Sequence, residues 1–212
     1  MKIAKLCYDP SFCNTYVLGE EGEPALIIDP GYNHSGVLNR YITKHHGGKI
    51  LAIALTHGHF DHFAGMAEME DLSSFPTFLS EEDYPCLTDA KKNASFDLSE
   101  PFLLKKDINP YFIEDEDEIK IGPYLFRVLH TPFHTKGSCC FYFEDEGILF
   151  TGDALFRLGV GRDDLPHAEP RSKQKSLAKI FALPKETKIY PGHGPSSSLA
   201  AEAPYLRNYL LN

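Results

Sequence analysis

The chain has 212 residues, 42% of them hydrophobic and 24% charged, which is ordinary for a folded protein and argues against intrinsic disorder. This length supports a sizeable hydrophobic core, and because no repeat, low-complexity tract or Pro/Gly-rich linker divides it, we expect one domain over residues 1–212. The formal net charge of −9 is unfavourable for binding a phosphate backbone or an anionic membrane, so neither a nucleic acid nor a membrane is an expected partner.

The N-terminal stretch contains no apolar run long enough for a signal peptide or a bilayer-spanning segment, and we therefore expect a cytoplasmic protein. Five cysteines without any CxxC pair favour reduced thiols in that compartment. Because successive side chains of a strand point to opposite faces, the adjacent Cys139 and Cys140 are not expected to bond to each other. No pattern in the sequence predicts an oligomeric state.

Short apolar runs separated by turn signals dominate the first quarter of the chain. Four of them have strand length and are predicted strands: 2–7, 15–18, 25–28 and 50–55. A helix is predicted over 35–46, because two glycines follow it and favour a helix end. The spacing of Phe63, Met66 and Met69 predicts a further short helix after the fourth strand.

The second half repeats this alternation after a stretch with few signals. Residues 81–87 favour a helix, and the rest of 80–110 is expected to form an irregular or helical insertion. Helices are predicted over 171–183 and over 199–211, the second interrupted at Pro204. Strand signals return over five runs: 119–121, 124–130, 138–143, 148–151 and 187–190. Strand groups followed by helices in both halves indicate sheets packed inside with helices outside.

Four side chains of metal-ligand type fall within six residues, directly after the predicted strand 50–55: His57, His59, Asp61 and His62. Neutral imidazole and carboxylate are good ligands for Zn²⁺, Fe²⁺ and Mn²⁺. If the chain turns at Gly58, His57 and His59 can converge on one ion, while Asp61 and His62 can face an adjacent ion. An isolated histidine would be an ordinary structural residue, but this density of ligands predicts a metal site.

The pattern HxHxDH in this segment resembles the metallo-β-lactamase superfamily. Four further segments resemble motifs of that family in the same order along the chain: 29–31 (DPG), 130–137 (HTPFHTKG), 151–156 (TGDALF) and 190–194 (YPGHG). The resemblance implies an α+β protein, specifically an αββα four-layer sandwich with its metals at one edge of the two sheets.

The same resemblance implies seven ligands for two divalent metal ions. One ion would take His57, His59 and His134, the other would take Asp61, His62 and His193, and Asp153 would bridge the two. His130 is expected to be structural, because the ligand of the family aligns with His134. Zinc is the expected metal, with iron and manganese as alternatives, because His/Asp sites accept several metals.

Two such ions with two carboxylates leave a small positive charge in the pocket, which favours an anionic small-molecule substrate. Paired metals generate hydroxide near neutral pH and polarise a carbonyl group. The expected reaction is hydrolysis with a metal-bridging hydroxide as the nucleophile. Asp61 is the expected catalytic residue, because its carboxylate can orient that nucleophile through a hydrogen bond.

Residues 151–166 resemble the hydroxyacylglutathione hydrolases, or type II glyoxalases, and their short bacterial relatives. This implies thioester hydrolysis, with Arg162 binding a carboxylate of the substrate. Two departures leave the carrier of the thioester open. Pro195 stands where that family has a tyrosine, and Arg207 is the sole basic residue among the 19 that follow His193, where longer members bind glutathione.

Two other functions are compatible with parts of the pattern. A mononuclear iron persulfide dioxygenase shares the fold, and its GxGRxD segment resembles residues 159–164, but its last motif reads PAHD where this chain has PGHG. A non-catalytic metal-binding protein is disfavoured by the full ligand set, because structural sites saturate one ion rather than hold two around open positions. We therefore expect a metal-dependent hydrolase.

Overall fold

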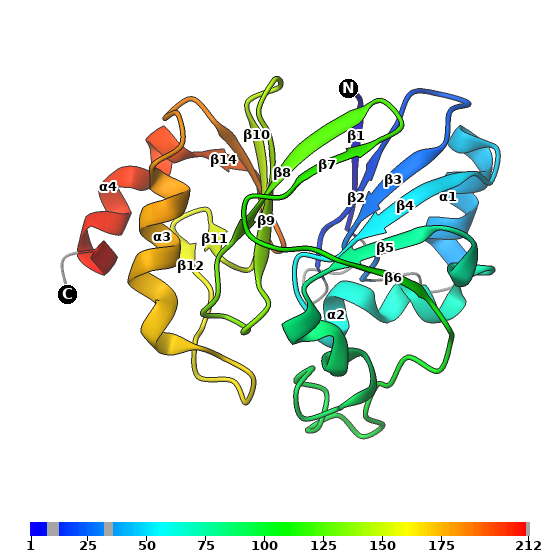
Figure 1. The fold of residues 1–212 in the computed structure, drawn as a ribbon, viewed down its shortest axis with the longest axis horizontal. Coiled ribbons are helices and arrows are strands. Elements are labelled where there is room, and N and C mark those ends of the chain that lie inside the picture. Colours follow the sequence, from blue (N-terminus) through cyan, green and yellow to red (C-terminus); the bar gives the residue numbers. More distant parts are fainter. Residues whose placement is uncertain (8–12, 32–35, 211–212) are drawn as a thin grey trace.

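Two six-stranded sheets lie face to face at the centre of the molecule (Figure 1). The computed structural model describes residues 1–7, 13–31 and 36–210. The first sheet is antiparallel from β1 to β3 and parallel from β3 to β6. Its strands, in spatial order, are β1 (Ile3–Leu6), β2 (Thr15–Leu18), β3 (Ala25–Ile28), β4 (Ile50–Ala54), β5 (Pro76–Leu79) and β6 (Asn109–Phe112).

The second sheet comes from the second half of the chain. Its β10 and β13 are parallel, and its other neighbouring strands are antiparallel. A short hairpin of β11 (Leu155–Phe156) and β12 (Gly159–Val160) follows β10. The strands of the sheet, in spatial order, are β14 (Ser197–Ser198), β13 (Lys188–Pro191), β10 (Ile148–Gly152), β9 (Cys139–Phe143), β8 (Tyr124–His130) and β7 (Glu118–Ile121).

Helices cover the outer face of each sheet (Figure 1). Helices α1 (Val37–His46) and α2 (Phe60–Phe63) lie on the side of the first sheet, and α3 (Lys173–Phe181) and α4 (Leu199–Leu210) lie on the side of the second. Buried apolar side chains form one cluster between the sheets and one under each helical layer. This arrangement confirms the predicted αββα four-layer sandwich.

Alternation of side chains along the central strands produces these layers. In β3, Leu26 and Ile28 face the second sheet, whereas Ile27 packs in the cluster under α1. In β9, Cys139 lies between the sheets and Cys140 lies in the cluster under α3 and α4. The two adjacent cysteines therefore point to opposite faces, as predicted, and neither forms a disulfide.

The predicted strands are confirmed to within one residue at each end, but the part of the chain that the structure describes contains five more. Three of these, β11, β12 and β14, have only two residues each. At the edge of the first sheet, β6 has all four residues exposed and contains Pro110. It therefore shows no alternation of apolar and polar side chains, and proline is rarely a sign of a strand.

The helices differ from the prediction mainly at their ends. The predicted helix limits at 35 and 211 lie outside the described residues. Helix α2 begins at Phe60, earlier than predicted, and passes into the 3₁₀ helix η2 (Ala64–Glu68). Helix α4 continues through Pro204, because the buried Leu199 and Leu206 hold it to the sheet on both sides. Within the described ranges, no helix is long and apolar enough to cross a membrane.

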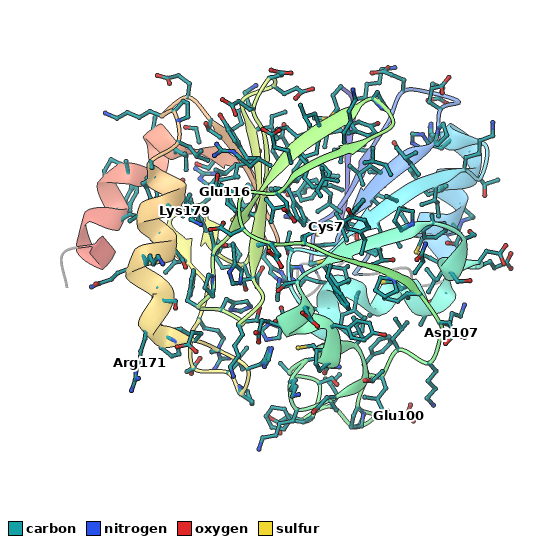
Figure 2. The ribbon with its side chains drawn as sticks, viewed as in Figure 1. Cys7, Glu100, Asp107, Glu116, Arg171 and Lys179 are labelled. Carbon is teal, nitrogen blue, oxygen red and sulfur yellow. The ribbon has the colours of Figure 1, made fainter. Side chains whose placement is uncertain are left out.

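The insertion after β5 begins with the 3₁₀ helix η4 (Glu81–Thr88) and continues as turns. Asn93 closes these turns, since its fully buried side-chain amide donates to the carbonyl of Phe102. The backbone carbonyl of Asn93 accepts from the N–H of Phe60 at 3.0 Å. Figure 2 shows Glu100 on the outer side of this insertion. The insertion is thus tied to the start of α2 at one side and is exposed at the other.

Phe141 lies between the sheets, is fully buried, and contacts Phe126 with ring centroids 5.4 Å apart. Replacing it in Phe141→Ala is expected to lower the free energy of unfolding by about 3–5 kcal/mol, measured by urea denaturation, because a large cavity would remain. The control Leu125→Ala removes a side chain that is 48% exposed, and its effect should stay within about 0.5 kcal/mol. Equal losses in the two variants would contradict this placement of the core.

Candidate metal centre

The seven predicted ligands come together at one end of the sandwich, from segments that follow the ends of different strands. Two follow β4, two lie in α2, and the others follow β8, β10 and β13. Because β10 and β13 are parallel, their C-terminal ends meet at the same sheet edge. Among the predicted ligands, three groups have ligand atoms within 4.8 Å of one another: His57, His59 and His134; His57, His62 and Asp153; and Asp61, His62 and His193.

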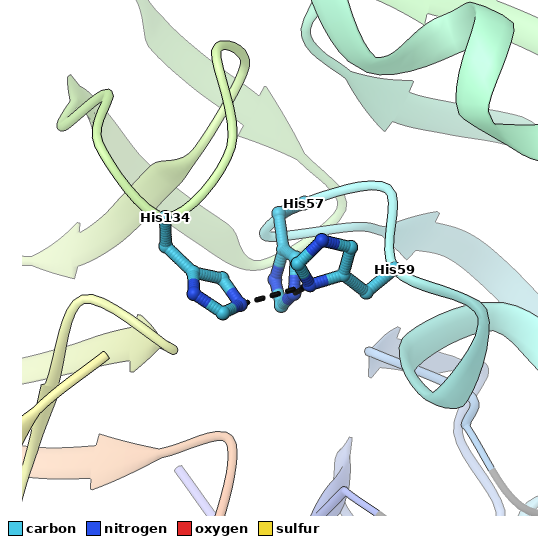
Figure 3. Close-up of side chains that lie close together, drawn as sticks. All are labelled: His57, His59 and His134. Atoms are coloured by element: carbon cyan, nitrogen blue, oxygen red, sulfur yellow. Dashed lines mark hydrogen bonds between the residues drawn. The ribbon is translucent and has the colours of Figure 1, made fainter. Parts of the chain in front are cut away.

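The first group consists of three histidines, each with at most 3% of its surface exposed (Figure 3). Nδ1 of His59 lies 2.8 Å from Nε2 of His134 and 3.2 Å from Nε2 of His57. The close-up shows the three rings turned toward one another from two separate loops. Three ring nitrogens therefore face a common small space.

Hydrogen bonds behind these rings fix which nitrogen carries the proton. Nδ1 of His134 donates to the carbonyl of Arg162 at 2.7 Å, which leaves a lone pair on Nε2. The hydroxyl of Thr56 donates to the carboxylate of Asp29 at 2.7 Å, and it therefore accepts from Nδ1 of His57 at 3.2 Å. Nε2 of His57 consequently also carries a lone pair. Such outer contacts are what orient metal-binding histidines in proteins.

Asp61, His62 and His193, called the second group from here on, join two histidines with a carboxylate. Nε2 of His193 lies 3.1 Å from Oδ2 of Asp61, and Nε2 of His62 lies 3.8 Å from the same oxygen. Oδ1 of Asp153 is 3.4 Å from Nε2 of His62, and its Oδ2 is 3.4 Å from Nε2 of His134. Asp153 therefore contacts both groups.

Asp29 supports both groups from behind. Its carboxylate accepts from Nδ1 of His62 at 2.9 Å and from the backbone N–H of Thr56 at 2.7 Å. Its backbone has a φ of 49°, a left-handed conformation that is uncommon outside glycine. One carboxylate thus orients His62 directly and His57 through the hydroxyl of Thr56.

Three buried polar atoms of these residues, Nε2 of His59, Nε2 of His62 and Oδ1 of Asp153, lack a hydrogen-bond partner among the described residues. Buried polar atoms are satisfied in the great majority of cases, so these atoms call for a missing partner. A divalent cation satisfies lone pairs and carboxylates at once, and a His/Asp donor set suits zinc, iron or manganese. The residues present therefore fit metal ions.

The electrostatics of the first group agree with this chemistry. Burial, followed by the neighbouring histidines, lowers the pKa of His57, and burial with His134 lowers the pKa of His59 to about 3. Burial alone would raise the pKa of Asp153, but His62 and other histidines outweigh it and hold that pKa below its ordinary value. Neutral imidazoles and an ionised carboxylate are the forms that bind metal.

Histidines of the second group show the opposite direction. Burial alone would lower the pKa of His62, but the charges of Asp61, Asp153 and Asp29 raise it above the ordinary value. Burial likewise opposes the rise at His193, where the hydrogen bond with Asp61 dominates and raises the pKa. The carboxylates thus attract positive charge to this half of the centre, which a proton or a metal cation can supply.

The loop that carries His193 is tied to the segment just before β2. The backbone N–H of Asn14 donates to the carbonyl of Gly192 at 2.6 Å. Its side-chain amide donates to the carbonyls of Pro191 and Gly194 at 2.8 and 2.9 Å, across 177 and 180 positions of the chain. These three carbonyls lie on both sides of His193, so Asn14 fixes the loop from the far end of the sequence.

Arg162 and His130, both considered in the sequence analysis, lie outside the three ligand groups. Arg162 contacts the centre through its backbone carbonyl, while its guanidinium is exposed and bonded to Asp164 at 2.6 and 2.9 Å. His130 lies outside the three ligand groups and donates to the carbonyl of Lys136. The sequence prediction missed the supporting roles of Asp29 and Thr56, and the DPG turn was the one signal that pointed to Asp29.

Comparison with known proteins agrees with this geometry. The family model described as "Metallo-beta-lactamase superfamily" matches residues 8–193. The chain is 34% identical to the "Probable metallo-hydrolase YqgX" of Bacillus subtilis, with 100% of both chains covered. It is 33% identical to a "Hydroxyacylglutathione hydrolase" of Francisella tularensis subsp. novicida, with 91% of this chain and 68% of the relative covered.

Solved structures give the same picture. The BLEG-1 B3 metallo-beta-lactamase superposes with a TM-score of 0.87 at 31% identity, covering 100% of both chains. The structure of TTHA1623 in a di-iron-bound form superposes with a TM-score of 0.80 at 34% identity, covering 94% of this chain and 96% of the other. Both similarities extend over the whole sandwich rather than over one sheet.

Two glycines of the segment 159–164 offer a matched test of the packing behind the centre. A Cβ at Gly161 would lie 1.9 Å from the carbonyl oxygen of Asp153 and 3.2 Å from Nδ1 of His134, whereas a Cβ at Gly159 would meet nothing within 4 Å. Gly161→Ala is expected to lower the free energy of unfolding of the metal-free protein by about 1–3 kcal/mol in urea. Gly159→Ala should change it by no more than about 0.5 kcal/mol. Similar values for both variants would show that the close approach at Gly161 does not exist.

Proposed function

The chain belongs to the metallo-β-lactamase superfamily, and from that premise we propose that it is a binuclear metal-dependent hydrolase of thioesters of the hydroxyacylglutathione type. The observation that carries the proposal is the pair of adjacent ligand groups that share contacts with Asp153. A structural metal site would close around one ion, whereas two neighbouring groups suit two ions with positions left for a substrate.

The distances between ligand atoms divide the proposed ligands into two sets, one for each ion. His57, His59 and His134 would hold one ion, Asp61, His62 and His193 the other, and Asp153 would contact both. When bound, a pair of divalent ions supplies hydroxide near neutral pH and polarises the carbonyl of a substrate. Zinc is the proposed metal, while the similar di-iron structure supports iron as the alternative.

Asp61 is the proposed catalytic carboxylate. Its side chain is 18% exposed and that of His193 is 28% exposed, whereas His62 beside them is buried, so solvent reaches Asp61 from the side of His193. Burial alone would raise the pKa of Asp61, but His62 and the hydrogen bond with His193 outweigh it and lower the pKa. An ionised carboxylate at this point can accept a hydrogen bond from an attacking water and orient it.

The substrate class rests on similarity and on one side chain. The hydroxyacylglutathione hydrolase relative supports a thioester, and the guanidinium of Arg162 is the proposed contact for a substrate carboxylate. That guanidinium is 61% exposed, and its partner Asp164 is 66% exposed, so a ligand can compete for it. We include a cytoplasmic location in the proposal, which the buried thiols of Cys86 and Cys140 support, because they form no disulfide.

The first test is to purify the protein without added metal, quantify bound zinc, iron and manganese, and assay hydrolysis of S-D-lactoylglutathione. We expect about two ions per chain and thioester turnover. His59→Ala and His193→Ala should each lose about one ion and reduce turnover by at least about 100-fold. His130→Ala removes a histidine outside the ligand groups and should retain both ions and turnover.

The other outcomes of this experiment separate the alternatives. Two ions without turnover would reject S-D-lactoylglutathione as the substrate and direct the assay to other thioesters and, because of the similarity to BLEG-1, to β-lactams. A single iron ion with oxygen uptake on glutathione persulfide would show that the protein is a persulfide dioxygenase and not a hydrolase. Retention of both ions in His59→Ala would contradict the proposed ligand set.

Arg162 can be tested without disturbing the metals, because the structure links it to His134 through the backbone only. Arg162→Ala is expected to raise the KM for S-D-lactoylglutathione about 10-fold, with metal content and kcat unchanged, since a charge-assisted contact to the substrate would be lost. Arg157→Ala, an exposed arginine on the β11–β12 turn, serves as the matched control and should leave KM unchanged. Equal KM values for wild type and Arg162→Ala would rule out the proposed substrate contact.

A further inference from the structure

Asp83 is a buried carboxylate of η4 that belongs to neither proposed ligand set, and it is 1% exposed. Four donors surround it. Oδ2 accepts from the backbone N–H of Gly58 at 2.8 Å and from the hydroxyl of Thr135 at 2.6 Å. Oδ1 accepts from the backbone N–H of Gly137 at 2.8 Å and lies 3.1 Å from Nε2 of His167.

Three of these donors, Gly58, Thr135 and Gly137, belong to the two loops that carry the three-histidine group. Gly58 lies between His57 and His59, and Thr135 directly follows His134. One carboxylate therefore holds the loop after β4 and the loop after β8 at the same time. The separation of these loops sets the distances among the three ring nitrogens, which come from both sides (Figure 3).

The glycines in both loops are matched to this contact. A Cβ on Gly137 would lie 2.6 Å from Cγ of Asp83, and a Cβ on Gly58 would lie 2.9 Å from the carbonyl oxygen of Asp83 and 2.5 Å from Cβ of Cys86. Neither glycine has a positive φ, so clearance rather than backbone conformation requires glycine there. Both loops are thus shaped to let η4 approach them.

The same carboxylate lies near Cys86 and His167, with ligand atoms within 4.8 Å of one another. A third metal ion at this point would need free carboxylate lone pairs, yet three donors and a shared fourth already face the roughly four positions that a carboxylate offers. The fourth is shared because Nε2 of His167 is also 3.0 Å from the carbonyl of Glu82, so its single N–H lies between two acceptors. The cluster is therefore a closed hydrogen-bond network rather than a further metal site.

We propose that Asp83 is a positioning residue that joins the two loops of the three-histidine group and thereby sets the metal affinity of that group and not of the Asp61, His62 and His193 group. The second group is supported by Asn14 and by Asp29, which also reaches His57 through Thr56, and no hydrogen bond among the described residues joins either of them to Asp83. The inference rests on the proposed function for the identity of the two groups as metal sites. Loss of an outer contact of this kind weakens metal binding by about 10- to 100-fold.

The test isolates each group before Asp83 is changed. In a His193→Ala background the three-histidine group is measured alone, and in a His59→Ala background the other group is measured alone, by zinc titration against a chromophoric chelator. Asp83→Asn is expected to raise the zinc Kd about 10- to 100-fold in the first background and by less than about twofold in the second. The amide cannot accept from all four donors, because its nitrogen is itself a donor.

Glu202→Gln is the matched control, since Glu202 is also a buried carboxylate that accepts from a backbone N–H, that of Leu158. Both substitutions should lower the stability of the metal-free protein, but only Asp83→Asn should change a zinc Kd. If Asp83→Asn does not fold, Thr135→Val removes a single donor from the network and should raise the same Kd in the same background.

Several results would overturn the proposal: an unchanged Kd in the His193→Ala background, equal changes in both backgrounds, or an equal change in Glu202→Gln. A third zinc ion lost on Asp83→Asn and Cys86→Ala would do so as well, because it would make the cluster a metal site. Failure of the proposed hydrolysis is a separate outcome, since it is read from wild-type turnover, whereas this proposal is read from zinc affinity.

Discussion

Imidazole lone pairs that face one another in a buried space are unfavourable unless a proton or a metal cation lies between them. In this protein Nε2 of His57 and Nε2 of His134 both carry lone pairs, and both lie within 3.2 Å of Nδ1 of His59. The surroundings force this arrangement, because the proton on each outer nitrogen is already taken by the hydroxyl of Thr56 or by the carbonyl of Arg162. These local hydrogen bonds hold the rings in a geometry that suits a metal.

The sandwich makes this possible by bringing strand ends together at one edge. Each segment that carries predicted ligands follows a strand whose own side chains are packed between the layers, so these segments begin from fixed points. Two carboxylates then hold these segments in place through hydrogen bonds. Asp29 accepts from His62 and Thr56, and Asp83 accepts from the backbone between His57 and His59. A rigid scaffold with a supporting outer layer is the arrangement that precise metal sites require.

The sequence alone predicts the layers and the local part of the centre, and the structure explains why it predicts less of the rest. His57, His59, Asp61 and His62 are close in the chain, so their spacing is informative, whereas His134, Asp153 and His193 were identified only through the family resemblance. Strand β6 is exposed on every residue, so periodicity gives no signal there. Asp83 lies in an acidic 3₁₀ turn between Glu82 and Tyr84, and its importance depends on backbone groups of two distant loops, which no local pattern encodes.

The bonds from Asn14 to the His193 loop have a consequence for how the protein matures on the ribosome. The HxHxDH segment leaves the exit tunnel long before His193 is synthesised, because about two thirds of the chain separate them. A nascent chain therefore displays a partial set of imidazoles that no carboxylate of the second sheet yet complements. The anchoring contacts, which join residues 177 and 180 positions apart, form only after translation of the last strands. The seven predicted ligands are therefore brought together only after the strands that precede His193 have been translated.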